Sequence, residues 1–184
     1  MANPLASSTY QLTGAFHRDD NDVPITWRGL QTVSSKTLTA SGTTATVPIF
    51  TVVGQVEVTA LYGVITTALG NNTAAYWQFY DGTTANALTL NTGTSLTSAI
   101  AGGVISKKTT VGTALTLTAG TSGQVAESGT AGATYFQDFV LFANPLATSQ
   151  IDFVYTTSDT PTTGAITFYV RWVPLSAGSL ITAV

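Results

Sequence analysis

The sequence contains no cysteine and a single histidine, His17. Without cysteine the chain forms no disulfide, holds no metal through thiolates and has no thiol nucleophile. A Ser-His-Asp triad has only His17 available as its base, and zinc motifs with two or more histidines are excluded. The usual parts of most enzyme classes are missing, so we expect no catalytic activity and no cofactor.

Charged residues are also scarce. They make up 8% of the 184 positions, compared with about 25% in an ordinary soluble protein. The chain has six basic residues and a net charge of −3, and it lacks the clustered lysines and arginines that neutralise phosphates. We therefore expect no direct contact with nucleic acid.

Long hydrophobic runs are absent as well. No stretch approaches the roughly 18 apolar residues of a membrane span, and the first residues lack the pattern of a secretory signal. We therefore expect neither a membrane segment nor secretion through such a signal. Hydrophobic residues nevertheless account for 44% of the chain, which is enough apolar surface to offset the entropy of folding.

The patterning that is present is that of β-strands. In residues 165–173, apolar positions alternate with Thr167, Tyr169 and Arg171, which is typical of a half-buried strand. Turn-forming pairs separate such runs, and Asp81-Gly82 is predicted to close a hairpin. About ten strands are expected, near residues 9–16, 24–33, 46–53, 55–67, 74–80, 86–91, 113–118, 134–142, 150–157 and 165–173. No long segment has the periodicity of a helix.

The predicted fold class is therefore all-β. We expect an antiparallel β-sandwich, jelly-roll-like, with about ten strands and an N-terminal arm. A seven-strand immunoglobulin-like sandwich is the alternative, although it normally needs only about 100 residues. Residues 1–33 are predicted to form the arm or an outer strand pair, and residues 34–184 the sandwich domain.

The few charges are concentrated in FHRDDNDVPITWRGL, residues 16–30. Charges of both signs within a few positions suit pairing across the polar rim of an interface, although a solvated turn between two strands explains them as well. The acidic side chains offer oxygen ligands for calcium, but Ile25 and Thr26 stand where an EF-hand needs its glycine and later ligands, so no metal is expected. The predicted partner-binding residues are His17, Arg18, Asp19, Asp20, Asp22, Trp27 and Arg28.

Two other functions would use other residues. Paired carboxylates for glycoside hydrolysis would come from Glu57, Glu127, Asp138 and Asp152. Glu57, Asp138 and Asp152 occupy the polar positions of alternating strands, so a solvated sheet face explains them more simply. A sugar-stacking platform would come from Tyr76, Trp77, Tyr80 and Trp172. Here the alternation along residues 76–80 favours core packing for Trp77.

Three segments carry a family resemblance: TYQLTGAFHRDDNDVPITWRGL, QVEVTALYGVITTALGNNTAAYW and IDFVYTTSDTPTTGAITFYVRWVPLS. With its low charge and missing catalytic residues, the chain resembles the small β-sandwich decoration, or cement, proteins on the heads of tailed bacteriophages. The resemblance implies a homotrimer that binds the major capsid protein at hexamers or three-fold positions and stabilises the capsid. It also implies a place on the capsid surface of the virion, after synthesis in the host cytoplasm, and no catalysis. A phage tail or fibre domain, a minor capsid protein and a carbohydrate-binding β-sandwich module remain alternatives.

Overall fold

The computed structural model describes residues 29–39, 43–70, 72–91, 93–97, 99–107, 112–118, 138–157 and 163–184. These residues form eleven strands. The strands are β1 (Leu30–Thr37), β2 (Thr44–Val53), β3 (Gln55–Thr67), β4 (Asn72–Tyr80), β5 (Ala85–Ala87), β6 (Val104–Ser106), β7 (Thr116–Thr118), β8 (Phe139–Phe142), β9 (Ser149–Thr157), β10 (Ala165–Pro174) and β11 (Leu180–Ala183). No helix that could cross a membrane occurs within these ranges.

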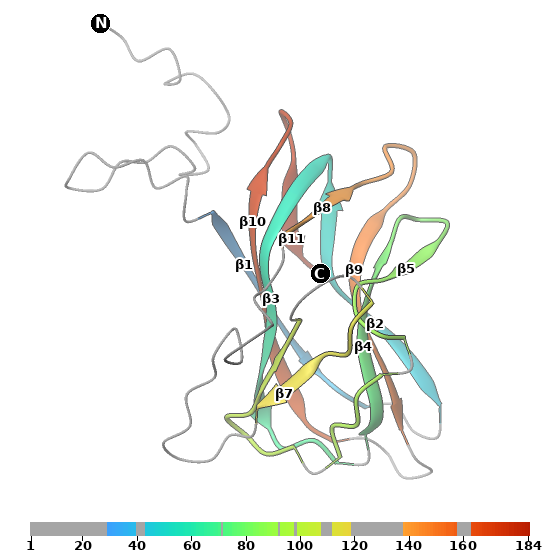
Figure 1. Cartoon of the computed structure of the whole chain (residues 1–184), viewed down its shortest axis with the longest axis vertical. Helices are drawn as coiled ribbons and strands as arrows, with labels where there is room; N and C mark the ends of the chain where they lie inside the picture. Colours follow the sequence, from blue (N-terminus) through green and yellow to red (C-terminus); the bar gives the residue numbers. More distant parts are fainter. Residues whose placement is uncertain are drawn as a thin grey trace, which may run out of the picture.

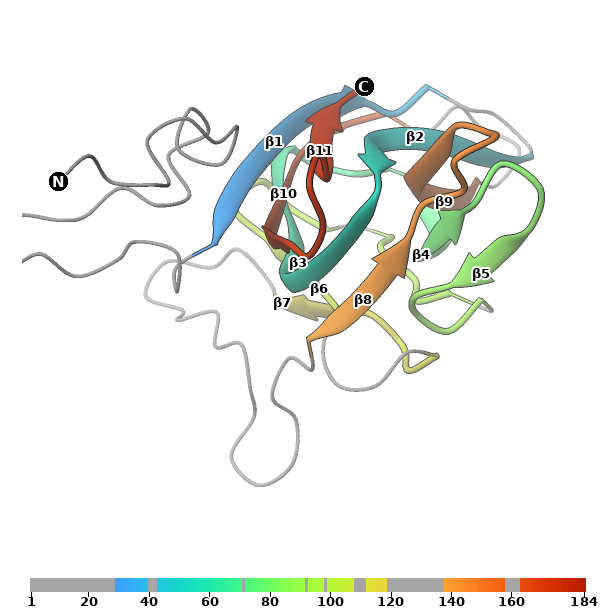
Figure 2. The same cartoon turned by 90° about the horizontal axis from the view of Figure 1, so that it is seen from above.

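The strands form two antiparallel sheets (Figures 1 and 2). One sheet has the order β1-β10-β3-β6-β7, and β8 also pairs with β3. The other sheet has the order β11-β2-β9-β4-β5. We refer to them as the β10 sheet and the β9 sheet. The predicted all-β antiparallel sandwich is confirmed.

Several strand boundaries differ from the prediction. The strand predicted at 24–33 is β1, which starts at Leu30 and pairs along its length with β10. The predicted boundary between the N-terminal segment (residues 1–33) and the sandwich domain (residues 34–184) therefore falls inside strand β1. Strands β6 and β11 were not predicted.

Apolar side chains from both sheets meet in the core. The predicted alternation in β10 is confirmed, because Ile166, Phe168 and Trp172 are buried whereas Arg171 is exposed. The Phe153 ring of β9 lies 5.1 Å from the Phe168 ring of the opposite sheet and 6.0 Å from the Trp77 ring of β4. Phe153 therefore connects the two layers at their centre.

The two long sides of the sandwich differ. On one side β1 and β11 are bridged by side chains: the Thr32 hydroxyl donates to the Ile181 carbonyl at 2.9 Å, and the Lys36 Nζ donates to the Val184 carbonyl at 2.8 Å. The Trp172 indole donates to the Thr32 hydroxyl at 3.1 Å. On the other side lie β5 and β8, and among the described residues no strand pairs with β8 beyond β3. Within the described ranges, no further strand covers this second side, which we call the open side.

The hairpin predicted at Asp81-Gly82 is confirmed, because β4 pairs with β5 across it. The Asp81 carboxylate accepts hydrogen bonds from the backbone N–H groups of Thr83 and Thr84 at 2.8 and 2.7 Å. These bonds, that from Thr84 first, lower the pKa of Asp81. Gly82 adopts a φ of 92°, a region that glycine enters without steric strain.

Gly82→Ala is expected to destabilise the fold more than the matched change Gly178→Ala. Both glycines have positive φ, so each variant loses about 1–2 kcal/mol to backbone strain. A Cβ at Gly82 would also overlap the Cβ of Ala147, whereas nothing lies within 4 Å of one at Gly178. Overpacking adds about 1–3 kcal/mol. Urea denaturation of both variants measures the difference, and equal losses would contradict this account of the turn.

Candidate interaction surfaces

All seven predicted partner-binding residues lie outside the part of the chain that the structure describes, because it starts at Gly29. They are His17, Arg18, Asp19, Asp20, Asp22, Trp27 and Arg28. Their role stays a prediction. The surfaces that can be described belong to the sandwich.

Of the four candidate carboxylates, Glu57 and Asp152 lie on opposite sheets, and Asp138 is an exposed residue directly before β8. Glu57 lies between Val56 and Val58, whose side chains are in the core, so it points outward from the β10 sheet. Asp152 lies between two core residues of β9 and points outward from the opposite sheet. Glu127 lies outside the described residues, and within those ranges no group of three or more His, Asp or Glu side chains could hold a metal ion.

Asp152 is buried although it occupies an outward-facing position, and its exposed fraction is 3%. The interpretation of this residue as part of a solvated face is therefore wrong. Its Oδ2 accepts a hydrogen bond of 3.0 Å from the Gln78 amide on β4, while its Oδ1 has no hydrogen-bond partner among the described residues. Burial raises the pKa of the Asp152 carboxyl, and the bond from Gln78 opposes that effect.

Asp152→Asn is expected to raise the melting temperature at pH 7. The ionised carboxylate is disfavoured by burial, and a neutral amide of the same shape removes that penalty while it can still accept from Gln78. Because the folded pKa of Asp152 lies above its unfolded value, the wild type regains stability as pH falls through the folded pKa. The advantage of the variant is therefore expected to shrink toward pH 3.8, the ordinary value for this group.

Asp81→Asn is the matched control, and it is expected to lower the melting temperature at pH 7. The lowered pKa of Asp81 means that its ionised form stabilises the turn at pH 7, and that this contribution is lost as pH falls through the folded pKa. Thermal melts from pH 3 to pH 8 compare the two variants. A wild type that melts above Asp152→Asn at pH 7 would contradict the account of the buried carboxylate.

The four aromatic residues considered for a sugar platform do not lie on one surface. Trp77 and Trp172 are core residues with exposed fractions of 0% and 2%. Tyr76 and Tyr80 remain half-buried on the outer face of β4, and the Tyr80 hydroxyl donates to the Gly82 carbonyl. The outer face of the β9 sheet therefore presents two tyrosines of the predicted four aromatic rings.

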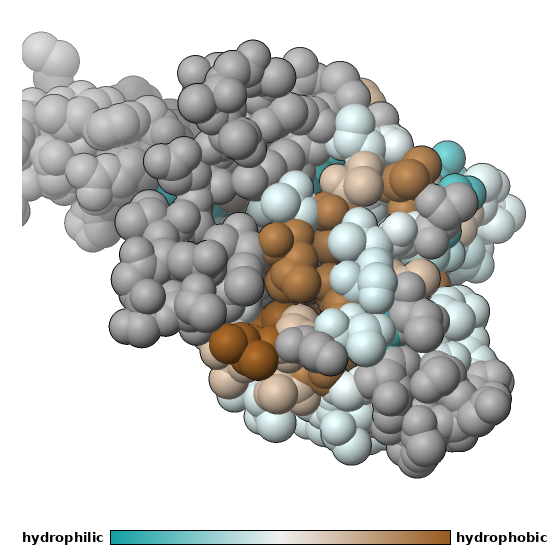
Figure 3. Space-filling model, turned by 60° about the horizontal axis from the view of Figure 1, so that its bottom comes forward, coloured by the Kyte–Doolittle hydropathy of each residue, from teal (hydrophilic) through white to brown (hydrophobic). Residues whose placement is uncertain are grey.

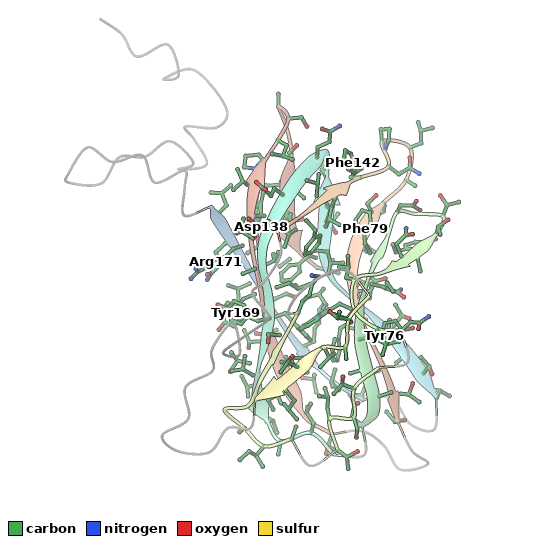
Figure 4. The ribbon with its side chains drawn as sticks, in the orientation of Figure 1. Tyr76, Phe79, Asp138, Phe142, Tyr169 and Arg171 are labelled. Carbon is green, nitrogen blue, oxygen red and sulfur yellow. The ribbon has the colours of Figure 1, made fainter. Side chains whose placement is uncertain are left out.

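The outer face of the β10 sheet carries a second tyrosine pair. The rings of Tyr62 and Tyr169 stack with centroids 4.9 Å apart and planes 8° from parallel. Beside them, the Arg171 side chain donates to the Gln31 amide oxygen at 3.4 Å. Tyr169 and Arg171 lie on the β1 side of the molecule, whereas Tyr76 belongs to the other sheet (Figure 4).

A groove of about 330 Å³ follows the open side of the sandwich, between β5 and β8. We call it the β5–β8 groove. Of the described residues that line it, Asp81 alone carries a charge, and its carboxylate is already bonded within the turn. The lining consists of Phe79, Asp81, Asn86, Ala87, Leu88, Phe139, Val140, Leu141 and Phe142. Figure 4 shows Phe79 and Phe142 near this side.

Lys107 is buried behind the groove. Its exposed fraction is 2%, and its Nζ lies 4.9 Å from the centroid of the Phe139 ring. Burial lowers the pKa of Lys107 to about 8. The alternation of β-strands gives no hint of this residue, since it follows the short strand β6.

Exposed apolar side chains lie around the β2–β3 turn at one end of the sandwich, on the outer faces of both sheets. Val53 pairs with Leu180 across the β9 sheet, Phe142 pairs with Gln55, and the Leu175 N–H donates to the Gln55 carbonyl at 2.9 Å. We call this region the apolar end. Its exposed members are Val53, Val140, Phe142, Leu146, Leu175 and Leu180.

Comparison of the chain with family models, curated proteins and solved structures finds no match.

Proposed function

We propose that this protein is a structural subunit of a virion, which associates with copies of itself and binds the outer surface of a phage capsid as a decoration protein. The observation that carries the proposal is the apolar end, where Phe142 and Leu146 are 63% and 93% exposed. Large apolar side chains that are this exposed mark candidate interaction sites. A surface with so little charge can be buried against protein without stranding ions.

The rest of the described surface supports the same interpretation. With the bottom of Figure 1 turned forward, Figure 3 shows a second apolar region, a band with weakly polar residues along one side. Of the described charged residues, Lys107 and Asp152 are buried. Such a surface suits several protein contacts at once, as a subunit between neighbours and a shell requires.

The strand pairing also supports a virion role. Taking β1–β5 and β8–β10 as eight strands in chain order, the first pairs with the last, the second with the seventh, the third with the sixth and the fourth with the fifth. We infer a jelly roll from this nested pairing, with β6, β7 and β11 as additions. Jelly rolls serve in viral capsid and lectin domains, which leaves two classes of function to separate.

The lectin class is the weaker candidate. Its aromatic platform would need exposed rings, but Trp77 and Trp172 are in the core. The polar group beside the remaining tyrosines is Asp152, whose Oδ1 is shielded from solvent. A sugar hydroxyl would have to displace packed side chains to reach it.

Two binding experiments separate the classes. The purified chain is expected to co-sediment with undecorated capsids from its source and to be detected by mass spectrometry in purified particles. It is expected to give no signal on a glycan array. Sugar binding together with absence from particles would overturn the proposal.

A further inference from the structure

We propose that the β5–β8 groove receives residues 9–16 from the N-terminal segment of a second copy, which adds a strand to β8 on the side where Val140 and Phe142 have no partner strand among the described residues. This inference rests on the self-association in the proposed function and names the contact that produces it. The donated sequence is TYQLTGAF.

The backbone of β8 is arranged to accept a strand. The Ala143 N–H donates to the Gly54 carbonyl at 2.9 Å. Hydrogen-bonded pairs alternate along an antiparallel ladder, so Leu141 bonds to β3 while the N–H and C=O groups of Val140 and Phe142 point away from it. Among the described residues no strand takes up these outward groups. An edge of this kind is a template for a further chain.

The side chains around this edge call for an apolar occupant. Val140 and Phe142 are 40% and 63% exposed, and the groove wall behind them is formed mainly by rings and aliphatic groups, with Asp81 and Asn86 as its polar members. In residues 9–16, Tyr10, Leu12 and Phe16 fall on one face of an extended chain. Residues 1–16 contain no charged side chain, so none would be buried without a partner.

The positions of donor and acceptor favour exchange between copies. The described chain begins next to β1, and β1 and β8 lie at opposite edges of the β10 sheet, with β10 and β3 between them (Figure 2). A donor at one edge and an acceptor at the other give a head-to-tail contact, which forms a ring when the rotation between copies closes and an open filament when it does not. The expected homotrimer is such a ring.

The length and charge of the segment between residues 9–16 and β1 fit an exchange between two copies. Residues 17–29 span at most about 45 Å when extended. They hold Arg18, Asp19, Asp20, Asp22 and Arg28, which suit a solvated passage between two subunits better than a path across the stacked tyrosines of the same sheet. The predicted partner-binding residues would then lie at the rim of the exchange contact.

Cysteine cross-linking tests the exchange directly, since the natural chain has no cysteine. A Leu12→Cys chain is co-expressed with a Val140→Cys chain that carries a mass tag, and both are treated with a short bis-maleimide. We expect a covalent heterodimer as the major product. The matched control replaces Val140→Cys by Ile100→Cys, which is also exposed but lies outside the groove, and it is expected to give none.

A second readout keeps failure of the exchange apart from failure of self-association. Light scattering gives the oligomeric state of each single-cysteine chain, and a chain with both Leu12→Cys and Val140→Cys reports links within one chain. An oligomer without the heterodimer, or with links only inside one chain, overturns the exchange and leaves the proposed function intact. A monomer overturns both.

Discussion

Replacing Phe153 by alanine is expected to lower the free energy of unfolding by about 3–5 kcal/mol, the range measured for large core aromatic residues. The Phe153 side chain is fully buried. Its ring contacts Phe168 in the opposite sheet, with centroids 5.1 Å apart, and Trp77 and Tyr155 in its own sheet at 6.0 and 6.1 Å. The cavity would open where the two layers meet, and neighbouring rings on both sides limit how far it can close.

Urea denaturation at one protein concentration measures this loss. Leu146→Ala is the control, because Leu146 is 93% exposed and surface changes usually stay within about 0.5 kcal/mol. A loss for Phe153→Ala no larger than the control would contradict the position of Phe153 at the centre of the core.

The second large effect is a pH dependence from Lys107. Burial lowers its folded pKa from 10.5 to about 8, so below pH 8 the folded state holds a buried ammonium that the unfolded state keeps in water. Between about pH 8 and 10.5 the unfolded chain binds more protons than the folded one, and stability therefore rises with pH. Solvent screening reduces the effect below the full 1.36 kcal/mol for each pKa unit, so we expect a rise on the order of 1–2 kcal/mol.

Lys107→Met is expected to remove this rise, since it keeps the length of the side chain without the titrating group. Lys36→Met is the matched control and is expected to keep it, because the Lys36 Nζ bonds to the Val184 carbonyl at an exposed position. Urea denaturation at several pH values from 7 to 11 measures how the free energy of unfolding of each variant depends on pH. The same slope in both variants would exclude Lys107 as its source.

The sandwich could be predicted from the sequence because apolar and polar residues alternate within each long strand. Residues 165–173 show which side chains face the core without knowledge of their neighbours. The short strands β6 and β11 have three and four residues, too few for a period to show. They are fixed by pairing with β3 and β2, which the local sequence does not contain.

The candidate surfaces could be predicted much less well, for the same reason. Alternation places Asp152 on an outer face, but its burial depends on side chains from flanking strands such as Gln78. The β5–β8 groove is formed by residues 79–88 and 139–142, which the topology brings together across a long separation in the chain. The charged segment that dominates the sequence lies outside the described residues.

We propose that copies of this chain and a capsid cover the apolar end and the β5–β8 groove. The most direct measurement is the mass in solution, by light scattering on a sizing column at micromolar concentration, of the full chain and of a chain without residues 1–22. We predict a homotrimer for the full chain, and a folded sandwich that no longer assembles for the shortened one. A full chain that is monomeric would contradict the claim.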